Sequence, residues 1–119
     1  MAKLTEYQKN EYREAKHYIH EYNGRVFFSR DYGVTIIIYP NSSYEGKNSN
    51  SVFVSYAVCA WQDKFSKKLG IIQARINNAV FSYIDNRDYQ TIAADFASAI
   101  TGNPIYSDEM IENMQLNRG

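Results

Sequence analysis

Apolar residues recur at helical spacing between Asp63 and Val80. They fall at steps of four, three, four and four, and therefore share one face: Phe65, Leu69, Ile72, Ile76 and Val80. Asp63 or Ser66 can accept hydrogen bonds from the unpaired N–H groups of the first turn. The pattern predicts a helix over residues 63–80.

Apolar runs before this stretch predict strands. Residues 25–30 and 34–39 flank Asp31-Tyr32-Gly33, and a short connection that contains glycine favours a hairpin. In the second run, Val34, Ile36 and Ile38 would share one face, and residues 35, 37 and 39 the other. After a polar, turn-rich segment over residues 41–51, the run 52–61 returns across the sheet. One set of its alternating residues is small enough to face a closely packed helix.

Capping signals predict further helices. Thr5-Glu6-Tyr7-Gln8 has the form of a capping box, and the helix it begins should reach Tyr22, where Asn23-Gly24 ends it. Residues 81–85 should be extended or turning. A helix should begin near residues 86–88 and end at Gly102 and Pro104. Residues 107–109 should cap a short final helix that docks through Met110, Ile111 and Met114.

Together these elements predict an α+β fold: a small antiparallel sheet with the N-terminal helix and two to three further helices packed on it. At 119 residues, the chain should form one domain over residues 1–119 and bury one core.

Cys59 is the single cysteine, which excludes an internal disulfide and a cysteine metal cluster and favours a reducing compartment. The N-terminus is charged and polar and no apolar run is long enough to span a membrane, so we expect a cytosolic protein without a membrane partner.

Charge and aromatic content narrow the choice of partners. The 13 basic and 13 acidic residues cancel, so no overall field attracts the chain to duplex DNA or RNA, or to an anionic membrane. The 11 tyrosines are more informative, because a tyrosine ring suits half-hydrated pockets and subunit interfaces. The apolar stripe of the first helix is rich in tyrosine, with Tyr12, Tyr18 and Tyr22 beside Ala15 and Ile19. We therefore expect a homo-oligomer.

Motifs of catalysis are missing from the sequence. It contains no Walker loop, dinucleotide glycine motif, zinc spacing or nucleophile elbow. His17 and His20 lie near Glu14 and Glu21, but no further strong ligand accompanies them, so no metal is expected. Cys59 is interpreted as a small buried hydrophobic residue, because both histidines lie on the distant first helix and a nucleophile needs a base. We expect a non-enzymatic protein without a cofactor.

Basic residues at particular positions favour anion binding. Lys64, Lys67 and Lys68 gather at the N-terminal end of the predicted central helix, where backbone N–H groups can receive a phosphate, and Arg75 follows on the same helix. Arg25 and Arg30 bracket the first strand, and arginine can hold phosphate through a forked hydrogen bond. For any single residue in this set, ordinary surface solubility is the preferred explanation.

The run from Ser51 to Arg75 resembles a small phage-encoded family, the Thoeris anti-defence sponge proteins. The resemblance consists of a strand that ends in small residues and Cys59, then Asp63-Lys-Phe-Ser-Lys-Lys-Leu-Gly70, then the downstream Arg75. It covers about a fifth of the chain. It implies a protein that sequesters, without cleaving it, the cyclic ADP-ribose isomer made by a bacterial antiviral sensor. It also implies dimers or higher assemblies in the host bacterial cytoplasm, with pockets built between subunits.

Residue type and placement then give a candidate ligand site. Lys68 and Arg75, with Arg25 or Arg30, would hold phosphates. Phe65, Tyr56 or Phe81 would stack on adenine, and Asn78 would hydrogen-bond a ribose or base.

Our first hypothesis is therefore a phage-encoded sponge for a cyclic nucleotide signal. The alternative is a phage inhibitor that binds a host defence protein directly through its tyrosine-rich surface. An enzyme that acts on a nucleotide ranks third. A sponge needs a concave pocket of basic and aromatic residues, whereas a protein inhibitor needs a broad exposed patch, often with an acidic face.

Overall fold

The sheet of this protein is antiparallel throughout, and strands that are consecutive in the sequence are mostly neighbours in space. The computed structural model describes residues 4–40, 51–59, 66–75, 78–82 and 88–113. Within them, five strands pair in the order β4-β3-β2-β1-β5. Their bounds are β1 Arg25–Ser29, β2 Val34–Pro40, β3 Ser51–Val58, β4 Asn78–Ser82 and β5 Ile111–Glu112.

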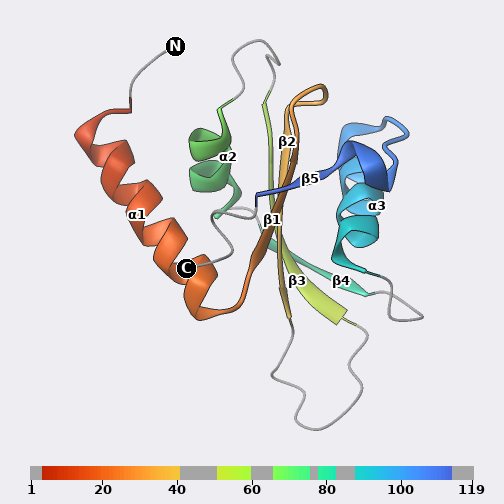
Figure 1. The fold of residues 1–119 in the computed structure, drawn as a ribbon, viewed down its shortest axis with the longest axis horizontal. Helices are drawn as coiled ribbons and strands as arrows, with labels where there is room; N and C mark the ends of the chain where they lie inside the picture. The colour runs from red at the N-terminus through yellow and green to blue at the C-terminus, as the bar shows by residue number, and fades with distance from the viewer. Residues whose placement is uncertain (1–3, 41–50, 60–65, 76–77, 83–87, 114–119) are drawn as a thin grey trace, which may run out of the picture.

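Helices cover both faces of this sheet and give a three-layer arrangement. Figure 1 shows α1 (Glu6–Glu21) and α2 (Lys67–Ala74) on one side of the sheet and α3 (Tyr89–Thr101) on the other. The single-turn 3-10 helix η2 (Ser107–Glu109) lies beside α3. The predicted α+β class, with an antiparallel sheet, an N-terminal helix and further helices, is confirmed.

Strand β2 forms the centre of both cores. Its residues from Val34 to Tyr39 are all buried, although they alternate between faces. Val34, Ile36 and Ile38 belong to the core under α3, while Ile37 and Tyr39 belong to the core under α1 and α2. The predicted division of this strand into two faces is confirmed, and both faces are covered.

Local signals in the sequence begin and end α1 and α3. Thr5 and Gln8 form the predicted capping box, with hydrogen bonds of 3.1 and 2.9 Å. Asp88 begins α3 by accepting the Thr91 backbone N–H at 2.8 Å, and this bond lowers the pKa of its carboxyl group. Gly102 ends α3 in the left-handed region at φ 72°.

The predicted helix over residues 63–80 is wrong at its C-terminal end. Helix α2 spans only Lys67–Ala74, and Asn78–Ser82 forms strand β4, in which Val80 pairs with Phe53. The backbone groups of residues 78–82 form ladder bonds with β3, which extends the sheet by one strand. Residues 60–65 and 76–77, with Trp61, Phe65 and Ile76, lie outside the described part of the chain.

The buried face of α2 also differs from the prediction. Ile71 and Ala74 are its buried residues, whereas Leu69 and Ile72 are only half-buried. Helix α2 contacts α1 as well as β2 and β3, and its buried residues Ile71 and Ala74 lie one position before and two positions after Ile72 of the expected stripe.

The predicted final helix is replaced by η2 and β5. Met110 docks into the core as expected, but Ile111 is exposed, and Met114 lies outside the described residues. Arg25 on β1 holds the new strand through two hydrogen bonds of 2.8 Å to the carboxylate of Glu112. These bonds raise the pKa of the Arg25 guanidinium.

Alanine substitutions at two adjacent isoleucines test the corrected face of α2. Ile71→Ala should lower the free energy of unfolding by about 2–5 kcal/mol, because the side chain is almost completely buried, at 1 % exposure. Ile72→Ala, half-buried on the neighbouring face, should cost less than about 1.5 kcal/mol. Urea unfolding monitored by circular dichroism measures both. An equal or larger loss of unfolding free energy for Ile72→Ala would support the buried face that the sequence predicted.

Candidate functional site

The structure separates the basic residues that the sequence analysis grouped together. Arg25 lies on the α3 face of the sheet, where Glu112 accepts both of its hydrogen bonds and the Tyr89 ring lies 5.1 Å away. Lys68 and Arg75 lie at the opposite face, on α2 and its C-cap. Arg30 is exposed in the turn after β1. Arg25 is therefore not part of a cluster with Lys68 and Arg75.

The predicted stacking residues are also spread across the fold. Tyr56 faces α3, where its ring packs at 5.3 Å from the Phe96 ring. Asn78 and Phe81 lie on β4, of which only the backbone pairing with β3 is described. Phe65 lies outside the described residues. Of the eight predicted ligand-binding residues, the structure brings together Lys68 and Arg75.

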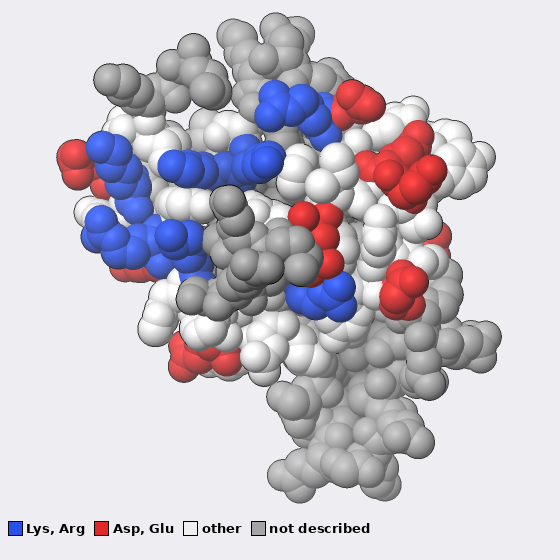
Figure 2. All heavy atoms as spheres, in the orientation of Figure 1, with Lys and Arg blue, Asp and Glu red and all other residues white. Residues whose placement is uncertain are grey.

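Both of these cations lie against tyrosine rings of α1. Lys68 Nζ is 5.4 Å from the centre of the Tyr12 ring, and Lys16 Nζ is 5.3 Å from the same ring. Arg75 Cζ is 5.5 Å from the centre of the Tyr18 ring. These are cation–π distances, so the tyrosine faces hold the cations along the seam between the two helices. In Figure 2, lysines and arginines gather over α1 and α2, and acidic side chains gather over the α3 side.

A groove of about 560 Å³ follows this seam, and we call it the α1–α2 groove. Its lining combines polar and apolar side chains of both helices, including Gln8, Glu14, Leu69, Gln73 and Arg75. Arg75 Nη1 lies 3.5 Å from Glu14 Oε2, and both side chains are at least one-third exposed. An exposed ion pair of this kind is weak, so an incoming anion can replace Glu14.

Tyr18 connects the groove to the core. Its ring lies 5.6 Å from the Tyr39 ring in an edge-to-face arrangement and 4.6 Å from the Tyr22 ring. Burial raises the pKa of Tyr39, so its hydroxyl keeps its proton over the physiological range. The ring that supports Arg75 is therefore itself supported from below by a buried neighbour.

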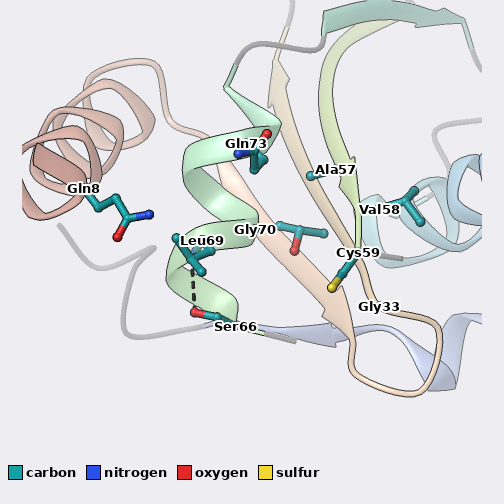
Figure 3. Close-up of a pocket in the computed structure, with 10 residues that line it drawn as sticks. Gln8, Gly33, Ala57, Val58, Cys59, Ser66, Leu69, Gly70 and Gln73 are labelled. Carbon is teal, nitrogen blue, oxygen red and sulfur yellow. Dashed lines mark hydrogen bonds between the residues drawn. The ribbon is translucent and has the colours of Figure 1, made fainter. Parts of the chain in front are cut away.

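A second hollow, of about 340 Å³, lies between α2 and the ends of β2 and β3, and we call it the Thr35 pocket. Figure 3 shows Leu69 and Gln73 of α2 on one side, Ala57 and Cys59 across from them, and Gln8 reaching in from α1. The described residues that line it carry no charged side chain. Cys59 is half-buried at this pocket, so its predicted place as a buried core residue is wrong.

The pocket is named for a buried hydroxyl group. Thr35 is 1 % exposed, and its Oγ1 has no hydrogen-bond partner among the residues that the structure describes. Gly70 of α2 lies directly opposite, since a Cβ built there would collide with Thr35 Oγ1. Glycine therefore allows α2 to approach β2 at this point.

The sequence analysis missed Thr35, Gly70, Gln8 and Gln73 as site residues. Two signals were visible: Thr35 interrupts the apolar run of β2, and Gly70 is unfavourable inside a helix. Neither signal alone distinguishes a pocket from ordinary packing.

No protein-family model, curated protein or solved structure matches this chain. Among the described residues, no helix is both long and apolar enough to cross a membrane. Within the same part of the chain, no group of three or more His, Cys, Asp or Glu side chains is placed to hold a metal ion.

Gly70→Ala tests the contact between α2 and β2. Helix propensity alone would make this change stabilising by about 0.8–1.0 kcal/mol. We expect instead a loss of about 1–3 kcal/mol, because the new methyl group would collide with the Thr35 hydroxyl. Thermal and urea unfolding measure the change.

The matched background is Thr35→Ala, which removes the colliding hydroxyl. There Gly70→Ala should cost at least about 1 kcal/mol less than in the parent, a departure from additivity expected for residues in contact. A stabilising Gly70→Ala in the parent protein would mean that α2 does not pack closely on β2.

Proposed function

We propose that this protein binds a cyclic ADP-ribose-type nucleotide signal in the α1–α2 groove and sequesters it without cleaving it. The observation that carries the proposal is the α1–α2 groove with Arg75 in its lining, together with the placement of Arg75 and Lys68 against the Tyr18 and Tyr12 rings of α1. Both cations belong to the run Ser51–Arg75 that resembles the Thoeris anti-defence sponges.

The groups of the groove suit the recognition of a diphosphate. The planar guanidinium of Arg75 can donate two parallel hydrogen bonds to one phosphate. Lys68 does not line the groove, but it precedes the lining residue Leu69 and supplies a second positive charge beside it. Lys16 adds a third cation beside the Tyr12 ring. Each hydrogen bond to a charged group contributes about 1.5–3 kcal/mol, so a small number of them gives useful affinity.

Sequestration is favoured over catalysis by the chemistry of the lining. Gln8 and Gln73 are neutral amides, Leu69 is apolar, and the lining has two carboxylates, Glu11 and Glu14, of which Glu14 is paired with Arg75. These groups bind and orient a ligand, whereas hydrolysis would need a positioned nucleophile with its base. We therefore propose a binding protein of the host cytoplasm that acts by removing a signal from solution.

We also propose that the protein is a homo-oligomer that pairs through α1. Tyr18 and Tyr22 lie side by side on this helix and are 40 % and 51 % exposed, which leaves an aromatic patch of the kind enriched in interfaces.

Light scattering at micromolar concentration should give more than the monomer mass, and Tyr22→Glu should shift the protein towards monomer. Tyr106→Glu is the control, because Tyr106 is 67 % exposed beside α3. A monomeric parent, or equal effects of both changes, would contradict pairing through α1.

One observation favours a second candidate, an inhibitor that binds a host defence protein directly. Residues 88–113 contain no lysine or arginine and five acidic residues: Asp88, Asp95, Asp108, Glu109 and Glu112. Glu112 forms an ion pair with Arg25. The α3 side therefore offers a negative surface that complements a basic protein surface. Failure of the parent protein to bind the nucleotide would move this candidate to first place.

Two arginine substitutions with opposite outcomes test the nucleotide proposal. Arg75→Ala should weaken binding of the cyclic ADP-ribose isomer by roughly 10- to 150-fold for each charge-assisted hydrogen bond lost, and leave the melting temperature nearly unchanged. Arg25→Ala should leave affinity unchanged and destabilise the fold by about 1–2 kcal/mol, because it removes the two hydrogen bonds to Glu112. Calorimetric titration and thermal unfolding separate the two effects. Unchanged affinity in Arg75→Ala would remove this residue from the site.

A further inference from the structure

The Thr35 pocket adjoins the α1–α2 groove but differs from it in chemistry. The two hollows share Gln8, Leu69 and Gln73, so a single ligand can extend from one into the other. The groove contains Arg75 and two glutamates, whereas the described lining of the pocket is uncharged. A ligand that spans both would therefore place its charged part in the groove and a neutral part in the pocket.

The walls of the pocket suit a flat, neutral ring. Ala57 and Leu69 provide apolar surface, and Gln73 and Ser66 provide hydrogen-bonding groups at the same opening. The Ser66 hydroxyl accepts the Leu69 backbone N–H at 3.3 Å, as the dashed line in Figure 3 marks, and its own O–H stays able to donate. The volume of about 340 Å³ lies within the range of small-molecule sites.

The Thr35 hydroxyl is the observation that points to an occupant. A buried hydroxyl group normally has a hydrogen-bond partner, and this one, at 1 % exposure, has none within the described structure. Its side chain lies on the face of β2 that carries Ile37, opposite Ala57 of β3, so an apolar residue would serve packing better at this position. A polar group on the edge of a ligand could hydrogen-bond Thr35 Oγ1 and supply the partner that this hydroxyl group lacks.

We infer that the Thr35 pocket takes the nucleobase of the nucleotide whose phosphates bind at Arg75 in the α1–α2 groove. The inference rests on the proposed function, since it assigns the base end of the same ligand. The base lies between the apolar walls, its edge hydrogen-bonds Thr35 and Gln73, and the phosphates lie in the α1–α2 groove. Specificity for the base is then set by neutral groups, while the cations hold the phosphates of any nucleotide.

The single cysteine gives a direct readout of occupancy. Cys59 lines the Thr35 pocket and does not line the α1–α2 groove. Alkylation of Cys59 by iodoacetamide should therefore be slowed at least fivefold by saturating adenosine or adenosine diphosphate. Inorganic pyrophosphate, which lacks a base, should bind without slowing it. Protein unfolded in urea, with the same additions, controls for direct effects on the reagent.

The affinities of three variants complete the test. Thr35→Val is nearly isosteric and should weaken the binding of adenosine and adenosine diphosphate about tenfold, with the affinity for pyrophosphate unchanged. Gln73→Leu changes an exposed residue of α2, should also weaken the binding of adenosine, and is the variant to use if Thr35→Val does not fold. Arg75→Ala should show the reverse pattern, with weaker pyrophosphate and unchanged adenosine.

The outcomes distinguish this inference from the function on which it rests. If adenosine diphosphate binds in an Arg75-dependent way, but neither Cys59 protection nor the Thr35 and Gln73 variants respond, the base assignment is overturned and the phosphate site stands. If pyrophosphate and adenosine diphosphate both fail to bind, the proposed function falls. Protection of Cys59 by adenosine alone would then still support a base pocket.

Discussion

The fold depends on a central strand that is apolar on both faces. Each buried valine or isoleucine of β2 is worth about 1.5–3 kcal/mol only while it is covered, so the sheet needs a helical layer on each side. Helix α3 covers Val34, Ile36 and Ile38, and α1 with α2 covers the opposite face. This requirement brings α2 down onto β2, where Gly70 meets Thr35, and thereby fixes where Lys68 and Arg75 stand relative to α1.

Most elements could be predicted because their signals are local. Each of these signals acts within a few residues of the chain. The Thr5–Gln8 capping box begins α1, Asp88 begins α3, and Gly102 ends α3. The end of α2 could not be predicted in this way, because residues 78–82 pair with β3, and an apolar run of that length fits a helix or a strand. Strand β5 depends on the Arg25–Glu112 contact, which joins residues 87 positions apart. No local pattern contains that information.

The candidate site was predictable to a smaller extent for the same reason. Charge and residue type selected Lys68 and Arg75, which both lie against tyrosine rings of α1, and Arg75 also lines the α1–α2 groove. Type alone could not show that Arg25 is held by Glu112 on the other face of the sheet. Thr35 and Gly70 indicate a site only when they are considered together. Only after α2 is packed on β2 does the Thr35 hydroxyl lack a partner and does Gly70 lie against it.

The uneven burial of α1 has a consequence for how a ligand would be released. Its buried residues, Ala15 and Ile19, lie in its C-terminal half, while the turns that carry Gln8 and Tyr12 rest on half-buried contacts. Local unfolding begins where burial is least, so these turns should exchange their amide hydrogens faster than the strands of the core. They also form one wall of the α1–α2 groove. A bound molecule that bridges α1 and α2 would suppress this fraying, and the lifetime of the complex would be governed by how often the first turns of α1 open.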